Sequence, residues 1–197
     1  YPIDDYVDQY HTMTANQVNR FLKAKENETL DNFLPVGNEI RLNARYMIMR
    51  NQNPKFTLQH DYEVHLQGVI DRLFLEDGGY VPMELKTGPW KDYKLAGMRK
   101  ESAFYKLLLE QATDEELAKF GLDPDVPVTH WGWFYPASNH FYVEKIKQTS
   151  TTALLKGIAK LIHDYENAEF PTKYYFKTCE FCSYLGICDA AQKSSWL

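Results

Sequence analysis

The sequence predicts an α/β fold in which a central mixed β-sheet is flanked by helices and a cysteine-rich segment forms the C-terminus. The chain of 197 residues suits one domain with a full hydrophobic core. Strand-like segments alternate with segments of helical periodicity, an order typical of α/β proteins. We therefore expect a single domain over 1–197, with a helical N-terminal part at 12–52, a core at 62–147 and a C-terminal helix with the cysteine cluster at 150–197.

Two helices are expected at the N-terminal end. Thr14, followed three residues later by Gln17, is a capping-box pattern and predicts a helix over 12–24. The run VGNEIRLNARYMIMRNQ, residues 36–52, predicts a second helix because its apolar residues fall at helical spacing: Ile40, Ala44, Met47 and Ile48.

Two β-hairpins and two further helices are expected after residue 60. In the first hairpin, YEVHLQGVIDRLFLE (62–76) is apolar on both faces near its centre, and YVPMELKTG (80–88) returns after a turn. The second hairpin, 128–146, turns at 136–139. Apolar stripes predict helices at 95–111 and 150–167, which gives the order α-α-β-β-α-β-β-α.

Charge is unevenly distributed along the chain. The net charge of −5 excludes a basic protein that coats nucleic acid. Between Lys86 and Lys106, however, six basic residues stand against two acidic ones, which suits either a groove that faces phosphates or a solvated helix face. No apolar run reaches the roughly 18–20 residues that span a bilayer, so we expect a cytoplasmic (intracellular) protein with no membrane partner.

Three charged residues lie near the ends of the two strands of the first predicted hairpin. Alternation along a strand puts Glu84 and Lys86 on one face, and hairpin pairing brings Asp71 towards them. Two close carboxylates repel unless a cation neutralises them, and Mg²⁺ prefers such oxygen ligands, to which the carbonyl of Leu85 can be added. Lys86 could then position a metal-bound water or stabilise charge that develops on a phosphate. The alternative is a simple ion pair at a strand end.

The motifs GVID and ELKTG, with ESAFYKLLLE in the helix that follows, resemble those of the PD-(D/E)XK nucleases. The similarity spans roughly residues 35 to 190 and is to the RecB-like branch, which includes CRISPR-associated adaptation nucleases with an iron–sulfur cluster. It implies a restriction-endonuclease-like fold in which 62–147 is the catalytic core. By this resemblance, Asp71 and Glu84 are the metal carboxylates for Mg²⁺ or Mn²⁺, Lys86 is the catalytic lysine, and Tyr105 belongs to the helical motif, where Glu101 replaces a glutamine.

The same resemblance implies one further metal ligand. The branch has a His on an upstream helix, and the predicted helix at 36–52 contains none. Glu39 is the best substitute as an oxygen ligand, and Asn43 is a weaker one.

The implied activity is metal-dependent hydrolysis of DNA phosphodiesters, by an exonuclease, an endonuclease or both, on single-stranded or end-bearing DNA. The implied partners are DNA and other proteins of a CRISPR or DNA-repair system. The alternative is a catalytically weak or inactive module on the same fold that binds nucleic acid or a protein partner.

All three cysteines lie in one short stretch, CEFCSYLGIC, as Cys179-x2-Cys182-x5-Cys188. An odd number of clustered cysteines favours a metal or cluster site over a disulfide framework. Tetrahedral Zn²⁺ and a [4Fe–4S] cluster both need four ligands. The resemblance implies a [4Fe–4S] cluster, with Zn²⁺ as the less favoured alternative. We expect the fourth Cys upstream of Tyr1, with a replacement by His11 or an incomplete site as the alternatives.

Overall fold

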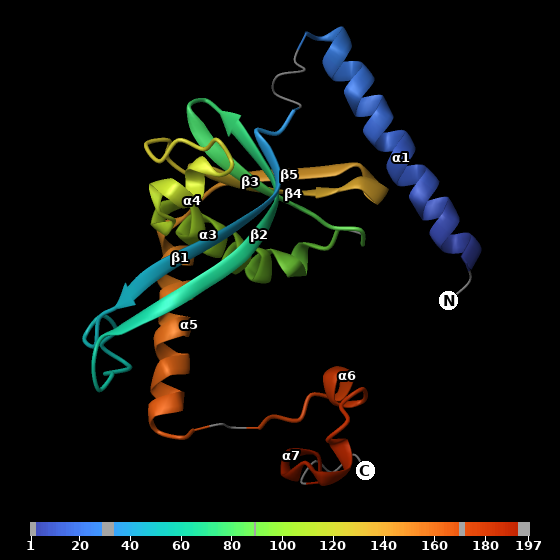
Figure 1. Ribbon diagram of the computed structural model, residues 1–197. Coiled ribbons are helices and arrows are strands. Elements are labelled where there is room, and N and C mark those ends of the chain that lie inside the picture. The colour runs from blue at the N-terminus through green and yellow to red at the C-terminus, as the bar shows by residue number, and fades with distance from the viewer. Residues whose placement is uncertain (1–2, 29–33, 89, 170–171, 193–197) are drawn as a thin grey trace.

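The computed structural model describes residues 3–28, 34–88, 90–169 and 172–192. A five-stranded sheet in the order β1-β2-β3-β4-β5 forms its centre (Figure 1). β3 and β4 are parallel and all other neighbours are antiparallel, so the predicted mixed sheet is confirmed. The strands are β1 (Gly37–Ile48), β2 (Tyr62–Glu76), β3 (Gly79–Leu85), β4 (His130–Tyr135) and β5 (His140–Lys145).

Helices flank this sheet, as expected for an α/β fold. The longer ones are α1 (Ile3–Glu26), α3 (Leu95–Gln111) and α5 (Gln148–Glu166). The short ones are α4 (Asp114–Ala118), α6 (Phe176–Cys179) and α7 (Asp189–Gln192), with 3₁₀ turns at Asp92–Lys94, Pro136–Ser138 and Leu185–Ile187. α3 provides the crossover that a parallel β3–β4 pair requires. No helix in the described ranges is both long enough and apolar enough to span a bilayer.

The main core lies between the sheet and α3, which also packs against α5. Gly68 of β2 allows this close approach, because a Cβ there would lie 2.6 Å from Leu108 Cδ1 of α3. The core side chains come from both layers and include Ile40, Leu42, Ile70, Leu73, Leu107 and Leu108. This packing fixes the position of α3 over β2.

Residues 37–48 form strand β1, so the prediction of a helix over 36–52 and of a fully helical part at 12–52 is wrong. β1 pairs with β2 from Gly37 opposite Leu73 to Ile48 opposite Tyr62. Burial follows a period of two through Ile40, Leu42 and Ala44. Pairing and one-sided burial along the whole length of the strand outweigh any helical tendency of the segment. The observed order therefore begins α-β-β-β rather than α-α-β-β.

Helix α1 is longer than the predicted 12–24 and begins at Ile3. Asp4 and Asp5 lie in its first turn, where negative charge complements the helix dipole. No described residue of α1 is buried. In Figure 1, α1 runs beside the β4–β5 hairpin as a separate rod.

Three contacts made by two α1 side chains attach the helix to that hairpin. Asn16 Nδ2 donates to the Pro136 carbonyl at 2.7 Å. The Arg20 guanidinium lies 4.6 Å from the ring centroid of Phe134 and 3.9 Å from that of Phe141. Cation–π contacts of this kind join a polar helix to an apolar sheet face. The remaining predicted elements, the two hairpins and the helices at 95–111 and 150–167, are confirmed.

Candidate active site

Two neighbouring strands bring two carboxylates together. Arg72 of β2 pairs with Met83 of β3. Because the strands are antiparallel, Asp71, one residue before Arg72, lies beside Glu84, one residue after Met83. Asp71 Oδ2 accepts a hydrogen bond from the Leu85 backbone N–H at 2.8 Å. The antiparallel register thus creates the carboxylate pair that the sequence predicts.

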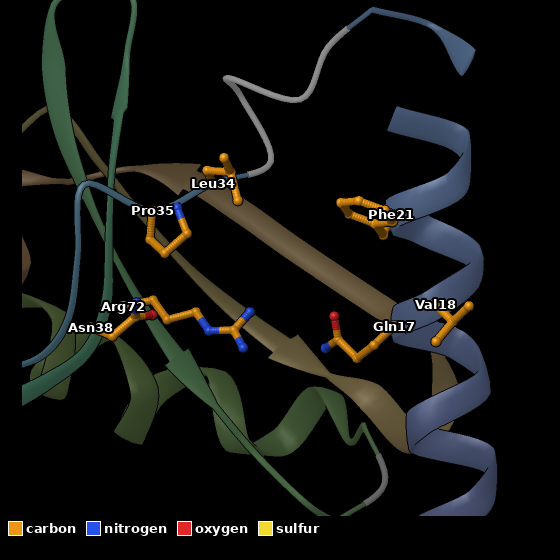
Figure 2. A pocket seen from close by; sticks show the side chains of 7 residues that line it. All are labelled: Gln17, Val18, Phe21, Leu34, Pro35, Asn38 and Arg72. Carbon is orange, nitrogen blue, oxygen red and sulfur yellow. The ribbon is translucent and has the colours of Figure 1, made fainter. Parts of the chain in front are cut away.

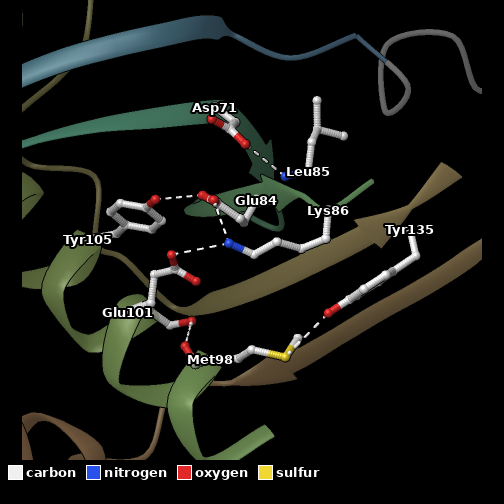
Figure 3. Close-up of polar contacts among 9 residues, drawn as sticks. Asp71, Glu84, Leu85, Lys86, Met98, Glu101, Tyr105 and Tyr135 are labelled. Carbon is white, nitrogen blue, oxygen red and sulfur yellow. Dashed lines mark hydrogen bonds and ion pairs between the residues drawn. The ribbon is translucent and has the colours of Figure 1, made fainter. Parts of the chain in front are cut away.

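Lys86 lies between two carboxylates just after the end of β3. Its backbone N–H donates to the Phe134 carbonyl at 2.9 Å, which extends the pairing with β4 by one residue. Its Nζ lies 2.7 Å from Glu84 Oε1 and 3.2 Å from Glu101 Oε1 of α3 (Figure 3). The Glu84 side chain is 14% exposed and that of Lys86 is 31% exposed, so the pair is partly screened from water. Lys86 is therefore held by both the sheet and the helix.

Tyr105 of α3 binds the other oxygen of the same carboxylate. Its hydroxyl donates to Glu84 Oε2 at 2.5 Å (Figure 3). Burial raises the pKa of Tyr105, and the hydrogen bond to Glu84 raises it further. Glu101 and Tyr105 are one helical turn apart, which explains how both reach Glu84 and Lys86 from one helix. Tyr105 is thus a neutral donor that fixes the orientation of Glu84.

The cluster carries more negative than positive charge. The Lys86 ammonium contacts the carboxylates of Glu84 and Glu101, and a third carboxylate, of Asp71, lies beside Glu84 on the neighbouring strand. Burial lowers the pKa of Lys86, but the hydrogen bond to Glu84 and the charge of Glu101 outweigh it, so the net pKa is raised. Lys86 is therefore cationic at neutral pH, and the excess of carboxylates favours a bound cation.

Comparison with known proteins places the chain in a family. The profile of the "PD-(D/E)XK nuclease superfamily" matches residues 3–189. The chain belongs to this superfamily. Among solved structures, the crystal structure of SSO0001 is similar, with a TM-score of 0.45 and 14% identity, and the match covers 95% of this chain and 79% of that chain. No curated protein matches the chain. Members of the PD-(D/E)XK superfamily are generally nucleases that commonly use Mg²⁺ or Mn²⁺, so membership implies a nucleic-acid substrate.

The oxygen donors of this candidate site suit a hard divalent cation in their chemistry. Asp71 and Glu84 supply carboxylates from adjacent strands, and Leu85 supplies a carbonyl between Glu84 and Lys86. Within the described ranges, no group of three His, Cys, Asp or Glu side chains is arranged to hold a metal ion. A cation here would therefore use two protein carboxylates and complete its coordination with carbonyl or water oxygens.

Glu39, the predicted substitute for the family His, lies on strand β1 and not on a helix. It is opposite Asp71, between the pairs Asn38–Arg72 and Ile40–Ile70. Its φ of 49° is in the left-handed region, which is uncommon for a residue other than Gly. Its side chain is exposed, and in the described part of the chain no hydrogen bond joins it to the carboxylate cluster. Its position near Asp71 agrees with the prediction, whereas its role as a ligand stays a prediction.

Asn43, the weaker predicted substitute for the family His, lies further along β1, opposite Gln67. Its side-chain amide donates to Glu116 Oε1 at 2.8 Å, and its backbone N–H donates to the same oxygen at 3.2 Å. These bonds attach α4 to β1, so Asn43 has a structural role in the fold.

The three cysteines follow one another through the short turns of the C-terminal segment. All are free thiols, and Cys182 is exposed. Cys179 Sγ accepts a hydrogen bond from the Tyr175 backbone N–H at 3.2 Å. Thiolates are suitable ligands for zinc or an iron–sulfur cluster, but three of them fill only three of the four positions that either needs. His11, the predicted alternative to a fourth cysteine ligand, is on α1. Figure 1 shows α1 well separated from α6 and α7, which belong to the cysteine segment.

An aromatic cluster next to the site was not predicted from the sequence. Trp90 follows Lys86 by four residues and packs on His140 and Tyr142, with ring centroids 4.3 Å and 5.2 Å apart. Trp90 also makes an edge-to-face contact with Tyr135, in which the ring centroids are 5.3 Å apart. This cluster anchors the segment that follows Lys86. The only signal in the sequence is the high aromatic content of residues 130–142.

Proposed function

We propose that the chain is a Mg²⁺- or Mn²⁺-dependent deoxyribonuclease of the RecB-like type that hydrolyses phosphodiesters in single-stranded or end-bearing DNA. The observation that carries the proposal is the hydrogen-bonded cluster in which Lys86 and Tyr105 both bind the carboxylate of Glu84, beside Asp71. Superfamily membership supports the same reading. We further propose that it acts inside the cell, on DNA, together with proteins of a CRISPR or repair system.

Each residue of the cluster has a role that its contacts support. Asp71 and Glu84, with the Leu85 carbonyl and Glu39 as a further oxygen donor, would hold the metal ion. When bound, that ion lowers the pKa of a water molecule and neutralises phosphate charge. Lys86, which is cationic, would donate hydrogen bonds to the phosphate oxygens.

Two residues of α3 act as positioning residues in this proposal. Tyr105 orients Glu84, and Glu101 holds the Lys86 ammonium at the end of β3. Both contacts come from one face of the helix that crosses between β3 and β4. The helix therefore connects the catalytic groups to the core.

The test is cleavage of labelled single-stranded DNA, duplex DNA and RNA in EDTA, Mg²⁺ or Mn²⁺, with Asp71→Asn beside the wild type. We expect metal-dependent cleavage of DNA by the wild type and none in EDTA or by Asp71→Asn. No cleavage of any substrate with either metal would favour the alternative, an inactive binding module. The exposed side chain of Glu39, which no hydrogen bond in the described part of the chain joins to the carboxylate cluster, is the observation that supports that alternative.

We also propose that Cys179, Cys182 and Cys188 bind a [4Fe–4S] cluster together with a fourth ligand, in a structural role. The spacing of the cysteines and the N–H···S bond to Cys179 support this proposal. Elemental analysis of protein purified without oxygen should find iron and sulfide, and Cys182→Ser should lose both. Zinc in place of iron would support the less favoured alternative and overturn the cluster.

A further inference from the structure

The basic residues of the segment 86–106 fall into two groups in the structure. Three of them pair with carboxylates of this chain: Lys86 with Glu84 and Glu101, Arg99 with Glu144, and Lys106 with Glu110. The other three have no carboxylate of the described residues within 4.0 Å: Lys91, Lys94 and Lys100. Positive charge that the chain itself does not pair is therefore gathered just after the ELKTG motif and at the start of α3.

Lys94 lies on the face of α3 that holds the carboxylate cluster. It directly precedes the first residue of α3, and its backbone is already helical, with φ of −75° and ψ of −19°. Lys94, Glu101 and Tyr105 are spaced as i, i+7 and i+11, which puts them along one face of the helix. The rise from Lys94 to Glu101 is about 10 Å along the helix axis. Lys94 thus extends the site beyond the contact between Lys86 and Glu101.

The Lys94 ammonium lies against the turn that follows β3. A Cβ added at Gly88, two residues after Lys86, would lie 3.9 Å from Lys94 Nζ. Lys86 is held by two carboxylates, whereas the Lys94 ammonium donates no hydrogen bond to any described residue. Its three N–H donors are therefore left for water or a ligand. A second cation thus lies beside the candidate active site.

The turn that carries Lys94 is held in place by its own contacts. Trp90, which the aromatic cluster anchors, donates from Nε1 to Asp92 Oδ1 at 2.7 Å, and the Lys94 N–H donates to the Lys91 carbonyl at 3.0 Å. Tyr93 is 78% exposed on this turn, more than any other tyrosine among the described residues. An exposed ring on an anchored turn is a surface on which a nucleic-acid base can stack. The turn therefore presents a ring and an ammonium on adjacent residues.

We propose that Tyr93 and Lys94 form a subsite for a nucleotide next to the scissile phosphate, in which the ammonium binds a backbone phosphate and the ring stacks on the base. The proposal rests on the proposed function, because it takes DNA to be the substrate, and it deepens that function by naming a contact that distinguishes single strands from duplexes. A base in a duplex must leave its stack to reach the ring, whereas an unpaired base need not. The phosphate contact carries no such requirement.

The phosphate contact is tested by binding of a labelled oligothymidine in EDTA, measured by fluorescence anisotropy over a range of salt concentrations. Lys94→Gln should weaken binding about tenfold, because a charged hydrogen bond is lost. It should also reduce the slope of log affinity against log salt by about 0.7, the value for one phosphate on a single strand. Lys94→Arg should keep both. Lys156→Gln, the same change at an exposed lysine of α5, should match the wild type.

Tyr93→Ala tests the base contact separately. It should weaken binding of the oligothymidine about tenfold and leave the salt slope unchanged, because stacking involves no phosphate charge. Tyr93→Phe should bind as the wild type does. On a strand of the same length without bases, Tyr93→Ala should have no effect, whereas Lys94→Gln should still weaken binding. Tyr165→Ala, at a ring of α5 that is 72% exposed, serves as the matched control.

Unchanged affinity for the oligothymidine in a folded Lys94→Gln or a folded Tyr93→Ala would overturn the subsite. An equal loss in Tyr93→Ala for the strand without bases, or for duplex DNA, would also overturn it, because the ring would then not contact an unpaired base. Because EDTA prevents cleavage, loss of binding in both variants of a protein that never cleaves would reject the proposed function and keep the subsite. Cleavage by the wild type with unaltered binding in both variants would do the reverse.

Discussion

Glu84 is held from two sides by residues that differ in charge. Lys86 binds one oxygen of its carboxylate and the neutral Tyr105 binds the other. Lys86 follows Glu84 by two residues along the chain, just after β3 ends, whereas Tyr105 reaches Glu84 from α3. A carboxylate with both oxygens engaged has a fixed orientation, which a metal ligand needs.

Tyr105→Phe removes one of these two contacts and leaves the ring in place. We expect cleavage to fall about tenfold, within the range found when hydrogen-bond partners of metal ligands are lost. The free energy of unfolding should fall by only about 1 kcal/mol, because one hydrogen bond is lost. Single-turnover cleavage and denaturant unfolding measure the two effects. A variant as active as the wild type would show that Tyr105 has no positioning role.

At the residue scale, much of the cluster can be predicted from the sequence. Strand alternation and hairpin pairing predict that Asp71, Glu84 and Lys86 converge, and the structure confirms that they do, although their catalytic roles stay predictions. The position of Arg72 in a groove cannot be predicted in this way. It depends on α1, which is distant in sequence and reaches β2 only through tertiary packing.

At the scale of elements, β1 shows where local patterns fail. Ile40, Ala44 and Ile48 fit a helical period and equally fit a period of two, in which Leu42 is also buried. The choice depends on whether a partner strand is available, and β2 is that partner along the whole of β1. The parallel pairing of β3 with β4 likewise depends on the crossover through α3 and has no local signal.

A charged pair connects α3 to the edge strand β5. Arg99 donates to Glu144 from Nε at 2.6 Å and from Nη2 at 2.9 Å, and the Tyr142 hydroxyl adds a third bond at 2.7 Å. The hydrogen bond from Arg99 lowers the pKa of Glu144 below its ordinary value of 4.5. A carboxyl whose pKa is lower in the folded state stabilises the fold above the unfolded pKa and loses this effect as pH falls.

Glu144→Gln tests that contribution. At pH 7 the variant should be less stable than the wild type by about 1–3 kcal/mol, because hydrogen bonds to a charged group are weakened. The difference should be constant above the unfolded pKa of 4.5 and shrink as pH falls through the lower folded pKa. Urea unfolding across this pH range measures it. A difference that grows towards acid pH would contradict the assignment, and Glu110→Gln, at an exposed i,i+4 pair, serves as the control.

At the scale of the whole molecule, the site joins the tight β2–β3 hairpin to α3 and lies against the β4–β5 hairpin. β2 and β3 supply the carboxylates, α3 supplies the residues that hold them, and the β4–β5 hairpin supports both the segment after Lys86 and helix α1. Figure 1 shows α1 on the side of the sheet away from α5, so the helices on the two sides of the sheet have different structural roles. α3 packs on the face of the sheet that carries the main core, and α1 lines a groove together with Asn38 and Arg72 (Figure 2).

The central claim is that the cluster around Glu84 cleaves DNA. The most direct test is single-turnover cleavage of labelled single-stranded DNA in Mn²⁺ by the wild type, Glu84→Gln and Glu110→Gln. Glu84→Gln keeps the shape and a hydrogen-bond acceptor but loses the charge, so we expect the rate to fall roughly a hundredfold or more. Glu110→Gln, at the exposed pair with Lys106, should cleave at the wild-type rate. Equal rates for all three proteins would contradict the assignment of the nuclease site to this cluster.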